Sequence, residues 1–458
     1  MTLGKMCIGF AVGSIAGSAG AWDPDNGDWS KTDPTDIRVM TWNVQDAICS
    51  TNPKGDISND DWTGIVRTIA AMKPDVILLQ ECADNNGNGT GVSADSQSTL
   101  EIVVDLMING GTDPFLGGTV GSYIKLFDPT LDYPTVFVSS VTDGFNRNVI
   151  MSRFPLGDVN NDAGQATLYD NILLLSGDAY APGGNGGLRG YAFCELDLPD
   201  DIYAGDLVIG NGHLKAGGSS SDAAQRREAA QNIAYWIDYF YNGAGTGIPD
   251  PNSVIPFDVP GVTTILDENT PVIWGGDLNQ NPSPTSGNSK SPAHWVTQAE
   301  NSGGSDGTDA DRSDSVFDTA SHPFTGDSST QGSSSKIDYI CWQDSKATAR
   351  RQFIFRSANG WPAGTPYPSP IDTFPPHPSL ISSASSDHRP VMVDFIVPLA
   401  KVTACPGDLN GDMTIDTADL GILLGQFGGA GSADLNDDGV VDTADLGILL
   451  GAFGAPCP

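Results

Sequence analysis

The chain has 458 residues, 39% of them hydrophobic, so it is long enough to bury a sizeable core and to hold two or three domains. Its formal net charge is −35, because 57 acidic residues outnumber 22 lysines and arginines. This excess argues against general electrostatic binding to nucleic acid, although bound divalent cations can reverse the local sign of charge. The 55 glycines and 31 prolines indicate many turns and long loops.

Residues 1–21 have the pattern of a secretory signal. Lys5 supplies a positive start, a small-residue apolar stretch follows, and Ala19-Gly20-Ala21 fits a cleavage site. The stretch is too short to cross a membrane, and no later segment reaches the roughly 20 apolar residues needed for that. We therefore expect a secreted protein without a transmembrane segment. Without Cys7, six of the seven cysteines remain, an even number that suits an oxidising compartment.

Apolar runs that follow a polar lead-in, residues 22–36, predict strands separated by helices and loops. The runs that predict strands are 37–44, 75–80, 148–151, 207–209, 271–275, 336–342 and 390–397. Helical spacing predicts helices over 62–72 and 222–240, and the Ser/Gly/Asp-rich stretch 281–335 is expected to be a loop that is mobile or faces substrate. Together these elements predict a layered α/β domain with covered sheets over residues 37–397, with a linker at 398–404.

Polar residues follow or precede several of these apolar strands. Desolvating such groups is costly unless they are paired or bind a metal. Each one alone allows a purely structural interpretation: Asn43 as a turn cap, Glu81 in a surface ion pair, His388 as a core histidine. Seven such positions in one chain indicate a functional site. They are Asn43, Glu81, His213, Asp277, Asn279, Asp387 and His388.

Six short motifs that contain these residues occur in a fixed order. They are W-N at 42–43, Q-E at 80–81, N-x-H at 211–213, G-D-x-N at 276–279, K-I-D-Y at 336–339 and S-D-H at 386–388. This order resembles the signature of the endonuclease/exonuclease/phosphatase family, and N-V-I-M-S-R-F-P at 148–155 also looks like a family segment. The resemblance implies a four-layer sandwich of two packed mixed β-sheets flanked by helices. It also implies hydrolysis of phosphoesters with Mg²⁺ or Mn²⁺.

The resemblance also implies a role for each residue of the motifs. Glu81 is expected to bind the metal with Asn43 beside it, and Asp387 to complete the metal shell. Asp277 is expected to orient and deprotonate the attacking water. The remaining roles concern the phosphate: His213 and Asn279 hold its non-bridging oxygens, His388 contacts the scissile phosphate, and Asp338 orients the His388 imidazole. Carboxylates suit hard cations, and imidazoles and amides can donate to phosphoryl oxygens.

Basic residues and the remaining histidines add less specific hypotheses. Arg147 and Arg189 are candidates for further phosphate contacts, with surface salt bridges as the alternative. Arg226 and Arg227, in the predicted helix, are expected to be structural. The histidines outside the motifs are expected at the surface; they are His294, His322 and His377. The substrate stays open between nucleic acid, for an extracellular nuclease, and phosphomonoesters or phospholipids. The alternative to an enzyme is a non-catalytic scaffold. The chain is expected to be a monomer.

The C-terminal residues 405–458 contain a repeat with a period of 26, in which the segment from Asp416 recurs identically from Asp442. Each copy offers oxygen ligands at EF-hand spacing, and together they predict two Ca²⁺ sites. The first would use Asp408, Asn410, Asp412, the carbonyl of Thr414, Asp416 and Asp419. The second would use Asp434, Asn436, Asp438, the carbonyl of Val440, Asp442 and Asp445.

Position 12 of each loop is Asp instead of the EF-hand Glu, and one helix follows each loop. These features resemble type I dockerin modules, which implies a small all-α calcium-binding module of two EF-hand-like loop-helix repeats and a cohesin-like protein partner. A self-contained stabilising cap is the alternative. Each helix is expected to have one apolar face, with Leu420, Leu423, Leu424 and Phe427 on the first.

The six remaining cysteines suggest disulfides. Cys49 and Cys82 each follow a predicted active-site strand and are expected to pair. Cys405 and Cys457 are expected to clasp the ends of the repeat. Cys194 and Cys341 are either a third pair or buried thiols.

Overall fold

The fold is described from a computed structural model. It describes residues 22–49, 60–82, 96–139, 146–156, 171–172, 177–178, 181–182, 190–236, 269–286, 290–297, 315–344, 346–358, 360–372, 377–400, 407–410, 414–436 and 438–454. The predicted signal segment, Arg189, Asp412, Met413, Cys405 and Cys457 lie outside these residues.

Strands and helices alternate along most of the described chain. The strands are β1 (Ile37–Asn43), β2 (Val76–Gln80), β3 (Gly111–Thr112), β4 (Thr119–Val120), β5 (Thr135–Val138), β6 (Val149–Ser152), β7 (Asn171–Ile172), β8 (Gly177–Asp178), β9 (Ala181–Pro182), β10 (Tyr191–Leu196), β11 (Leu207–His213), β12 (Val272–Asp277), β13 (Ser315–Phe317), β14 (Asp338–Gln343), β15 (Thr348–Ile354) and β16 (Val391–Ile396). The α-helices are α1 (Asp60–Met72), α2 (Gln97–Asn109), α3 (Tyr123–Phe127), α4 (Ser220–Trp236), α5 (Pro292–Val296), α8 (Ile381–Ser385), α9 (Thr417–Gln426) and α10 (Thr443–Gly451), and short 3-10 helices are η1 (Pro24–Asn26), η2 (Ala47–Cys49) and η5 (Pro378–Leu380).

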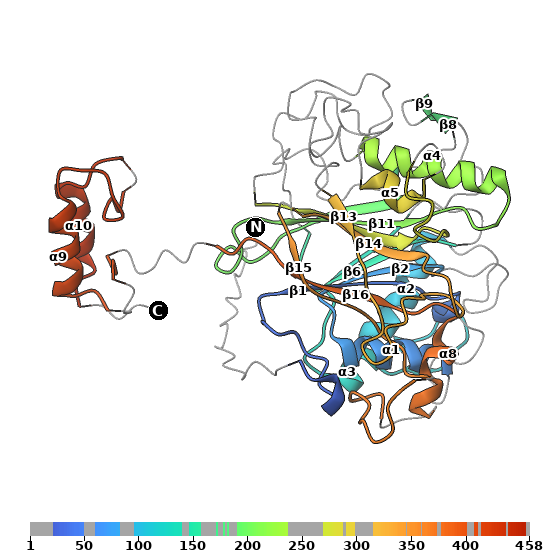
Figure 1. Cartoon of the computed structure of the whole chain (residues 1–458). Coiled ribbons are helices and arrows are strands. Elements are labelled where there is room, and N and C mark those ends of the chain that lie inside the picture. Colours follow the sequence, from blue (N-terminus) through green and yellow to red (C-terminus); the bar gives the residue numbers. More distant parts are fainter. Residues whose placement is uncertain are drawn as a thin grey trace, which may run out of the picture.

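Two six-stranded mixed sheets stack face to face. The first has the order β15-β16-β1-β2-β6-β5 and the second the order β13-β14-β12-β11-β10-β7. Helices α1, α2, α3 and α8 cover the first sheet, and α4 and α5 cover the second, so four layers result (Figure 1). This arrangement confirms the α/β fold with mixed sheets and flanking helices that the sequence predicts.

Apolar side chains fill the spaces on both sides of the first sheet. Ile37 and Val39 of β1 point into the core between the sheets, where they join Ile209 and Ile273 of the second sheet. The alternate residues point to the helical side; Met40, for example, packs in the cluster that contains residues of α1 and α2. Because β2 is buried on both faces, its sequence, Val76–Gln80, is a nearly continuous apolar run instead of an alternating one, whereas β1 also contains the buried Arg38, which is paired with Asp394 of β16.

Each sheet contains one parallel pair of strands joined through a helix. Strands β1 and β2 pair in parallel, with α1 between them in the chain, and β11 and β12 pair in parallel, with α4 between them. Parallel pairing needs such a crossover and brings the carboxyl ends of both strands to the same edge of the sheet. The two edges formed in this way carry the motif residues.

All seven predicted strands and both predicted helices are present, with boundary shifts of a few residues. The prediction that 281–335 is one long loop is wrong, because this stretch contains α5 and β13. The expectation that His322 is a surface residue is also wrong: it is 1% exposed, and its Nε2 lies 3.0 Å from the carbonyl oxygen of Arg356. His294 is half-buried and His377 is exposed.

Among the described cysteines no disulfide is formed, which corrects the predicted Cys49–Cys82 bridge. The Cys49 thiol donates instead to the carbonyl oxygen of Cys82, 3.0 Å away. Cys194 and Cys341 are buried thiols on β10 and β14, which are separated by two strands, or about 14 Å at normal strand spacing. That separation is too large for a bridge.

The C-terminal residues form two helices, α9 and α10, each preceded by an acidic loop (Figure 1). Their core is small: Ile415, Leu423, Ala433, Val441 and Leu449 are buried. The predicted apolar faces pack only in part, because the equivalent residues Leu424 and Leu450 are 55% and 53% exposed, and Phe427 and Phe453 are 46% and 42% exposed. In the part of the chain that the structure describes, no helix is long and apolar enough to span a membrane.

Candidate active site

The motif residues meet where the two sheets end side by side. Asn43 ends β1, His213 ends β11 and Asp277 ends β12, while Glu81 directly follows β2. Asp338 begins the antiparallel strand β14 and lies opposite Asp277 in the register. His388 lies three residues before β16. Segments from both sheets therefore contribute to one candidate site.

Two glycines allow the second sheet to form its part of this site. Gly212 and Gly276 are paired in the register, one residue before His213 and Asp277. Gly276 has φ of +155°, and a Cβ there would lie 1.7 Å from the carbonyl oxygen of Gly212. No residue with a side chain fits this position. The glycines of the two motifs thus let β11 and β12 bring His213 and Asp277 side by side.

Asp277 lies at the centre of the site and is 1% exposed. Its Oδ2 accepts a hydrogen bond from Asn43 Nδ2 at 3.1 Å and lies 3.4 Å from His213 Nε2 and 3.9 Å from His388 Nε2. Its Oδ1 accepts from the backbone N–H of Asn279 at 2.8 Å. Burial alone would raise its pKa, but the hydrogen bond and charge of His213, the charge of His388 and the Asn279 N–H together lower the pKa to about 2. Asp277 is therefore ionised at neutral pH.

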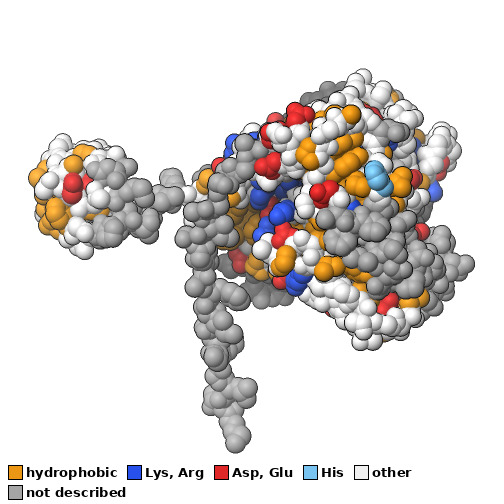
Figure 2. All heavy atoms as spheres, turned by 90° about the horizontal axis from the view of Figure 1, so that it is seen from below, with side chains coloured by type: hydrophobic (Ala, Val, Ile, Leu, Met, Phe, Trp, Pro, Cys, Tyr) orange, Lys and Arg blue, Asp and Glu red, His pale blue; other side chains and the backbone are white. Residues whose placement is uncertain are grey.

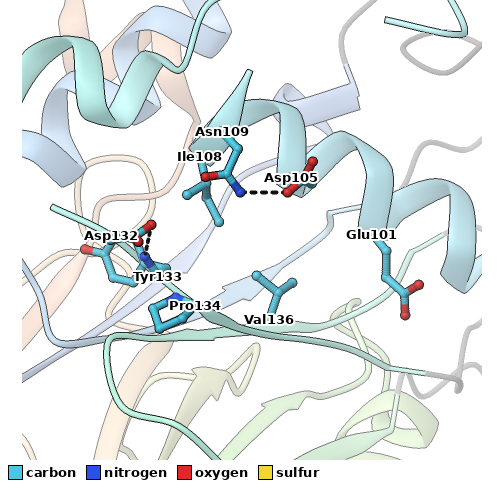
Figure 3. Close-up of a pocket in the computed structure, with 8 residues that line it drawn as sticks. All are labelled: Glu101, Asp105, Ile108, Asn109, Asp132, Tyr133, Pro134 and Val136. Carbon is cyan, nitrogen blue, oxygen red and sulfur yellow. Dashed lines mark hydrogen bonds between the residues drawn. The ribbon is translucent and has the colours of Figure 1, made fainter. Parts of the chain in front are cut away.

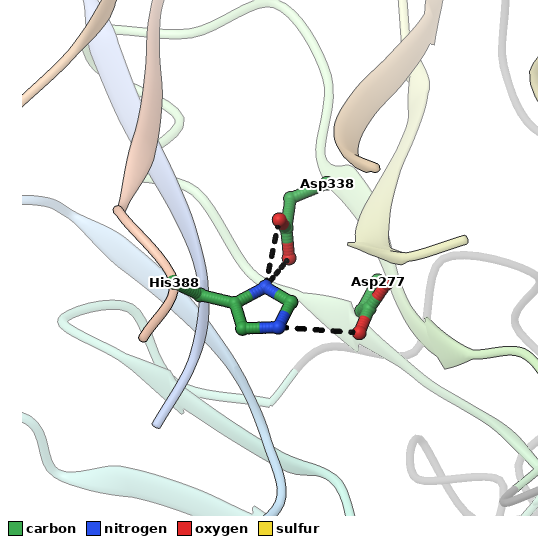
Figure 4. Close-up of side chains that lie close together, drawn as sticks. All are labelled: Asp277, Asp338 and His388. Atoms are coloured by element: carbon green, nitrogen blue, oxygen red, sulfur yellow. Dashed lines mark hydrogen bonds and ion pairs between the residues drawn. The ribbon is translucent and has the colours of Figure 1, made fainter. Parts of the chain in front are cut away.

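His388 is held by Asp338 from the other sheet. The His388 Nδ1 lies 2.9 and 3.1 Å from the two oxygens of Asp338, and Nε2 points toward Asp277 (Figure 4). Burial would lower the pKa of His388, but the charge of Asp338, its hydrogen bond and the charges of Asp277 and Asp387 raise it to about 10. Burial raises the pKa of Asp338, an effect that His388 opposes. The imidazole is thus fixed as a cation that presents one N–H to the site.

Two of the motif residues have left-handed backbone conformations. Glu81 has φ of +55° and Asn279 has φ of +54°. Asn tolerates this region, whereas a Glu there is uncommon and often marks a functional position. The Glu81 side chain is 22% exposed, and its Oε1 lies 3.7 Å from His213 Nε2. Asn279 Nδ2 donates to the carbonyl oxygen of Leu214 at 3.1 Å, which connects the turn after β12 to the turn after β11.

Arg226 of α4 forms hydrogen bonds with both the turn after β11 and the turn after β12. It is 5% exposed, and its Nη1 donates to the carbonyl oxygens of Lys215 and Gly217 at 2.7 and 2.8 Å. Its Nε donates to Gln280 Oε1 at 3.1 Å. This supports the structural interpretation of Arg226.

The remaining predicted residues lie at the edge of the site or outside the described residues. Asp387 is 45% exposed, and its Oδ1 lies 3.9 Å from His388 Nε2. Arg147 is half-buried; its Nη1 donates to the Ser139 carbonyl oxygen at 2.8 Å, and its own carbonyl accepts from the N–H of Cys82. Arg147 therefore lies beside the turn that carries Glu81, with one guanidinium nitrogen engaged by backbone.

The donors present fit a hard divalent cation. In the described residues, Asp277, Asp338 and His388 have ligand atoms within 4.8 Å of one another. Because His388 Nδ1 is bonded to Asp338 and the protonated Nε2 has no lone pair for a metal, the Asp277 carboxylate is the donor that this group offers to a cation. The Glu81 carboxylate adds a partly exposed oxygen donor. Carboxylate oxygens that remain accessible to solvent are the usual ligands of Mg²⁺.

A separate cavity of about 320 Å³ lies between α2 and the segment that leads into β5 (Figure 3). Three carboxylates, those of Glu101, Asp105 and Asp132, line it together with Ile108 and Val136. Asp105 accepts from Asn109 at 2.7 Å, and Asp132 is paired with Lys125 at 2.9 Å. None of the lining residues belongs to the motifs.

One comparison with known proteins shows the family of this chain. The model of the Endonuclease/Exonuclease/phosphatase family matches residues 40–388, and the chain belongs to this family, whose hydrolases act on phosphoester bonds. No curated protein matches the chain at a significant level.

Similar solved structures include an endonuclease/exonuclease/phosphatase from Beutenbergia cavernae, which is 18% identical with a TM-score of 0.40 and covers 81% of this chain and 73% of that one. The human Nocturnin catalytic domain is 14% identical with a TM-score of 0.39, covering 79% of this chain and 95% of that one. A mannosyl-6-phosphatase from Bacteroides thetaiotaomicron is 13% identical with a TM-score of 0.41, covering 79% of this chain and 99% of that one.

Proposed function

We propose that the chain is a secreted, metal-dependent phosphoesterase that hydrolyses phosphodiester or phosphomonoester bonds by attack of water. The observation that carries this proposal is the convergence of Asp277 with His213 and His388, at 3.4 and 3.9 Å, at the edge where Glu81 also lies. The signal-like pattern of residues 1–21 supports export.

In the proposed reaction the residues of this chain act on water and phosphate. Asp277 orients the water and takes its proton as the new P–O bond forms. The ester P–O bond breaks with its electron pair going to the leaving alcohol oxygen, which takes up a proton from solvent. His388 donates from Nε2 to a phosphoryl oxygen, while Asp338 holds the ring in position. His213 and Asn279 complete the set of donors. Glu81, with Asn43 and Asp387 beside it, would hold Mg²⁺ or Mn²⁺, which neutralises charge that develops on the phosphoryl group.

An extracellular nuclease is our first hypothesis for the activity, and the surface charge supports hydrolysis of a small phosphoester as the second. On the face in Figure 2, Lys and Arg side chains lie among Asp and Glu side chains. Many cations of the described residues are paired with carboxylates, as in Lys31–Asp75, Arg153–Asp75 and Arg350–Asp36. Paired cations offer less attraction to a polyanion than free ones do.

A substrate panel tests the proposal and separates these candidates. Plasmid DNA, RNA, sphingomyelin and a phosphomonoester are each incubated with wild-type protein in Mg²⁺ and in EDTA, with His388→Ala as the matched control. We expect turnover of at least one substrate that needs Mg²⁺ and that drops strongly in His388→Ala. Absence of turnover on all four would support a non-catalytic scaffold, and near-normal turnover in His388→Ala would overturn the assigned site.

We also propose that the C-terminal residues bind two Ca²⁺ ions and dock onto a cohesin-like protein. Nine aspartates and no lysine or arginine lie between Cys405 and Pro458. In the second loop the described ligand candidates lie close together: Asp438 and Gly439 donate backbone N–H groups to Asp434. Gly439 has φ of +90°, as the sharp turn of an EF-hand loop requires. The matching exposed pairs Leu424/Phe427 and Leu450/Phe453 offer equivalent apolar surfaces to a partner.

A further inference from the structure

Three buried carboxamides lie directly beneath the candidate active site, between the two sheets. Gln80 ends β2, Asn148 precedes β6, and Asn211 belongs to β11. All three are fully buried, with exposures of 0%. We call these three residues the amide cluster. Most of the surrounding interface between the sheets consists of apolar side chains.

The hydrogen bonds of the amide cluster connect one sheet to the other. Gln80 Nε2 donates to Asn211 Oδ1 at 2.8 Å. Asn211 Nδ2 donates back to the carbonyl oxygens of Leu79 and Val149 in the first sheet, at 2.8 and 3.0 Å. Asn148 Nδ2 donates to the carbonyl oxygen of Asn211 at 3.2 Å. Each bond fixes the distance between β11 and a strand of the opposite sheet.

The cluster is adjacent in the chain to residues on both halves of the site. Gln80 directly precedes Glu81, and Asn211 lies two residues before His213. Glu81 Oε1 and His213 Nε2 face each other at 3.7 Å across the two sheets. The sheets approach closely at this level, since a Cβ on Gly275 would lie 3.2 Å from Leu78 Cδ1. A change in sheet spacing here would move Glu81 relative to His213 and Asp277.

Burying amides in an apolar interface is energetically unfavourable unless their donors and acceptors are paired. In this cluster the pairing is incomplete, because Gln80 Oε1 and Asn148 Oδ1 are buried without a hydrogen-bond partner among the described residues. Apolar side chains of similar size would avoid this cost. A buried polar group that does not maximise stability can instead specify one arrangement of the elements around it.

We propose that Gln80, Asn148 and Asn211 are positioning residues that hold the two sheets at the spacing at which Glu81 faces His213 and Asp277. The inference rests on the proposed function, since it assigns the metal and the water to this site. A positioning role differs from a purely structural one in its consequence. Metal binding and turnover should depend on the amide cluster even in a variant whose stability is unchanged.

The experiment compares Gln80→Met, Asn211→Leu and the double variant in the full chain. Met and Leu keep approximate volume and remove the hydrogen bonds. Each single variant leaves a partner unsatisfied and should lower Tm, whereas the double variant should recover much of that loss. Mn²⁺ binding is followed by electron paramagnetic resonance, with Glu81→Gln identifying the binding event at the active site. Gln343→Met is the matched control, because Gln343 is equally buried at the opposite end of β14, where its Oε1 accepts from Val272 N–H.

In the double variant we expect active-site Mn²⁺ affinity to fall roughly tenfold or more, in the range seen when groups that orient metal ligands are removed. We expect kcat to fall by a similar factor, with a smaller change in KM. The Gln343→Met variant should have a lower Tm but wild-type Mn²⁺ affinity and kcat. Wild-type Mn²⁺ affinity and kcat in the double variant would overturn the proposal. Mn²⁺ binding that Glu81→Gln leaves unchanged would instead contradict the proposed metal site, with or without turnover.

Discussion

Buried aspartates occur in two regions of this molecule, and they are held in different ways. Asp277 and Asp338 in the α/β body have exposures of 1% and 0%, and Asp419 and Asp445 in the C-terminal repeat have exposures of 0%. In the body, side chains from distant strands hold them, such as Asn43 on Asp277 and His388 on Asp338. In the repeat, N–H groups of the residue's own loop do so: Asp445 accepts from Leu435, Asn436 and Asp442.

This difference indicates what each region needs in order to form. The body orients its carboxylates through the whole fold, with a large core and the cationic His388 imidazole as a partner, so its site is expected to persist without a metal. Among its described residues the repeat has five fully buried apolar side chains, and no basic residue lies between Cys405 and Pro458. A core of this size provides little stability, so bound cations are expected to contribute much of it.

The largest effect is expected for Asp277→Asn, which removes the proposed base and keeps its shape. Turnover should fall by roughly 10² to 10⁴-fold, as for loss of general base catalysis. The fold should persist, because Asn43, Asn279 and the strands around position 277 remain. Initial rates and circular dichroism melts measure both quantities. An unfolded variant would contradict the view that the body forms its site independently of this charge.

A smaller loss, roughly 10 to 100-fold, is expected for Asp338→Asn, because this residue acts through His388. The pH dependence gives a specific signature. In the wild type the pKa of His388 is raised to about 10. The stabilisation from His388 is therefore fully present below its unfolded pKa of roughly 6.5 and is lost as pH rises through about 10. Without Asp338 the pKa of His388 falls, so the alkaline limit of activity and of stability should move to lower pH.

At low pH, the stabilising contribution of Asp277 changes with pH in the opposite direction. The pKa of Asp277 is lowered to about 2, so its stabilising contribution is present above its ordinary pKa of 3.8 and is lost as pH falls through about 2. Rate–pH and Tm–pH profiles of wild type and Asp338→Asn measure both limits. An alkaline limit that is the same in both proteins would exclude His388 as the titrating group.

Much of this body could be predicted from the sequence, because its central strands are buried on both faces and most of their residues are apolar, as in Val76–Gln80. Strand β10 was missed, although its buried segment Tyr191–Leu196 is apolar except for Glu195. Strand β15 was missed because its sequence, Thr348–Ile354, contains two arginines and lies at a sheet edge. Charged edge strands lack the apolar run on which the prediction depends.

The site residues could be identified from motifs, and so could one pairing, because the resemblance implies that Asp338 orients His388, 50 residues away. The hydrogen bond from Asn43 to Asp277 joins residues 234 positions apart and is not implied by the motifs. The sequence indicates the amide cluster only through position, because Gln80 lies in the Q-E motif and Asn211 in the N-x-H motif. Its cross-sheet bonds depend on how the sheets stack, which no local pattern specifies.

The contrast between the regions predicts a selective effect of calcium removal. In the full chain, a calcium chelator should reduce the helical circular dichroism contributed by α9 and α10, and added Ca²⁺ should restore it. A chain that ends at Ala400 should show no such change and should keep phosphoesterase activity in Mg²⁺. Equal chelator effects in both chains would locate the calcium dependence in the body instead, and full helicity in EDTA would contradict coupled binding and folding.

The smallest effect is expected from a comparison of the two proposed calcium-binding loops. Gly439 occupies the sharp-turn position of the second loop with φ of +90°, where Met413 stands in the equivalent position of the first. A residue with a Cβ pays roughly 1–2 kcal/mol for left-handed backbone, which corresponds to about a tenfold weaker site. Calorimetry of the full chain should therefore show one tighter and one weaker Ca²⁺ site. Met413→Gly should strengthen the weaker site and Gly439→Met should weaken the tighter one, each by up to about tenfold, while Mg²⁺-dependent turnover stays unchanged. Two equal sites in the wild type would show that the turn at position 413 does not need left-handed backbone.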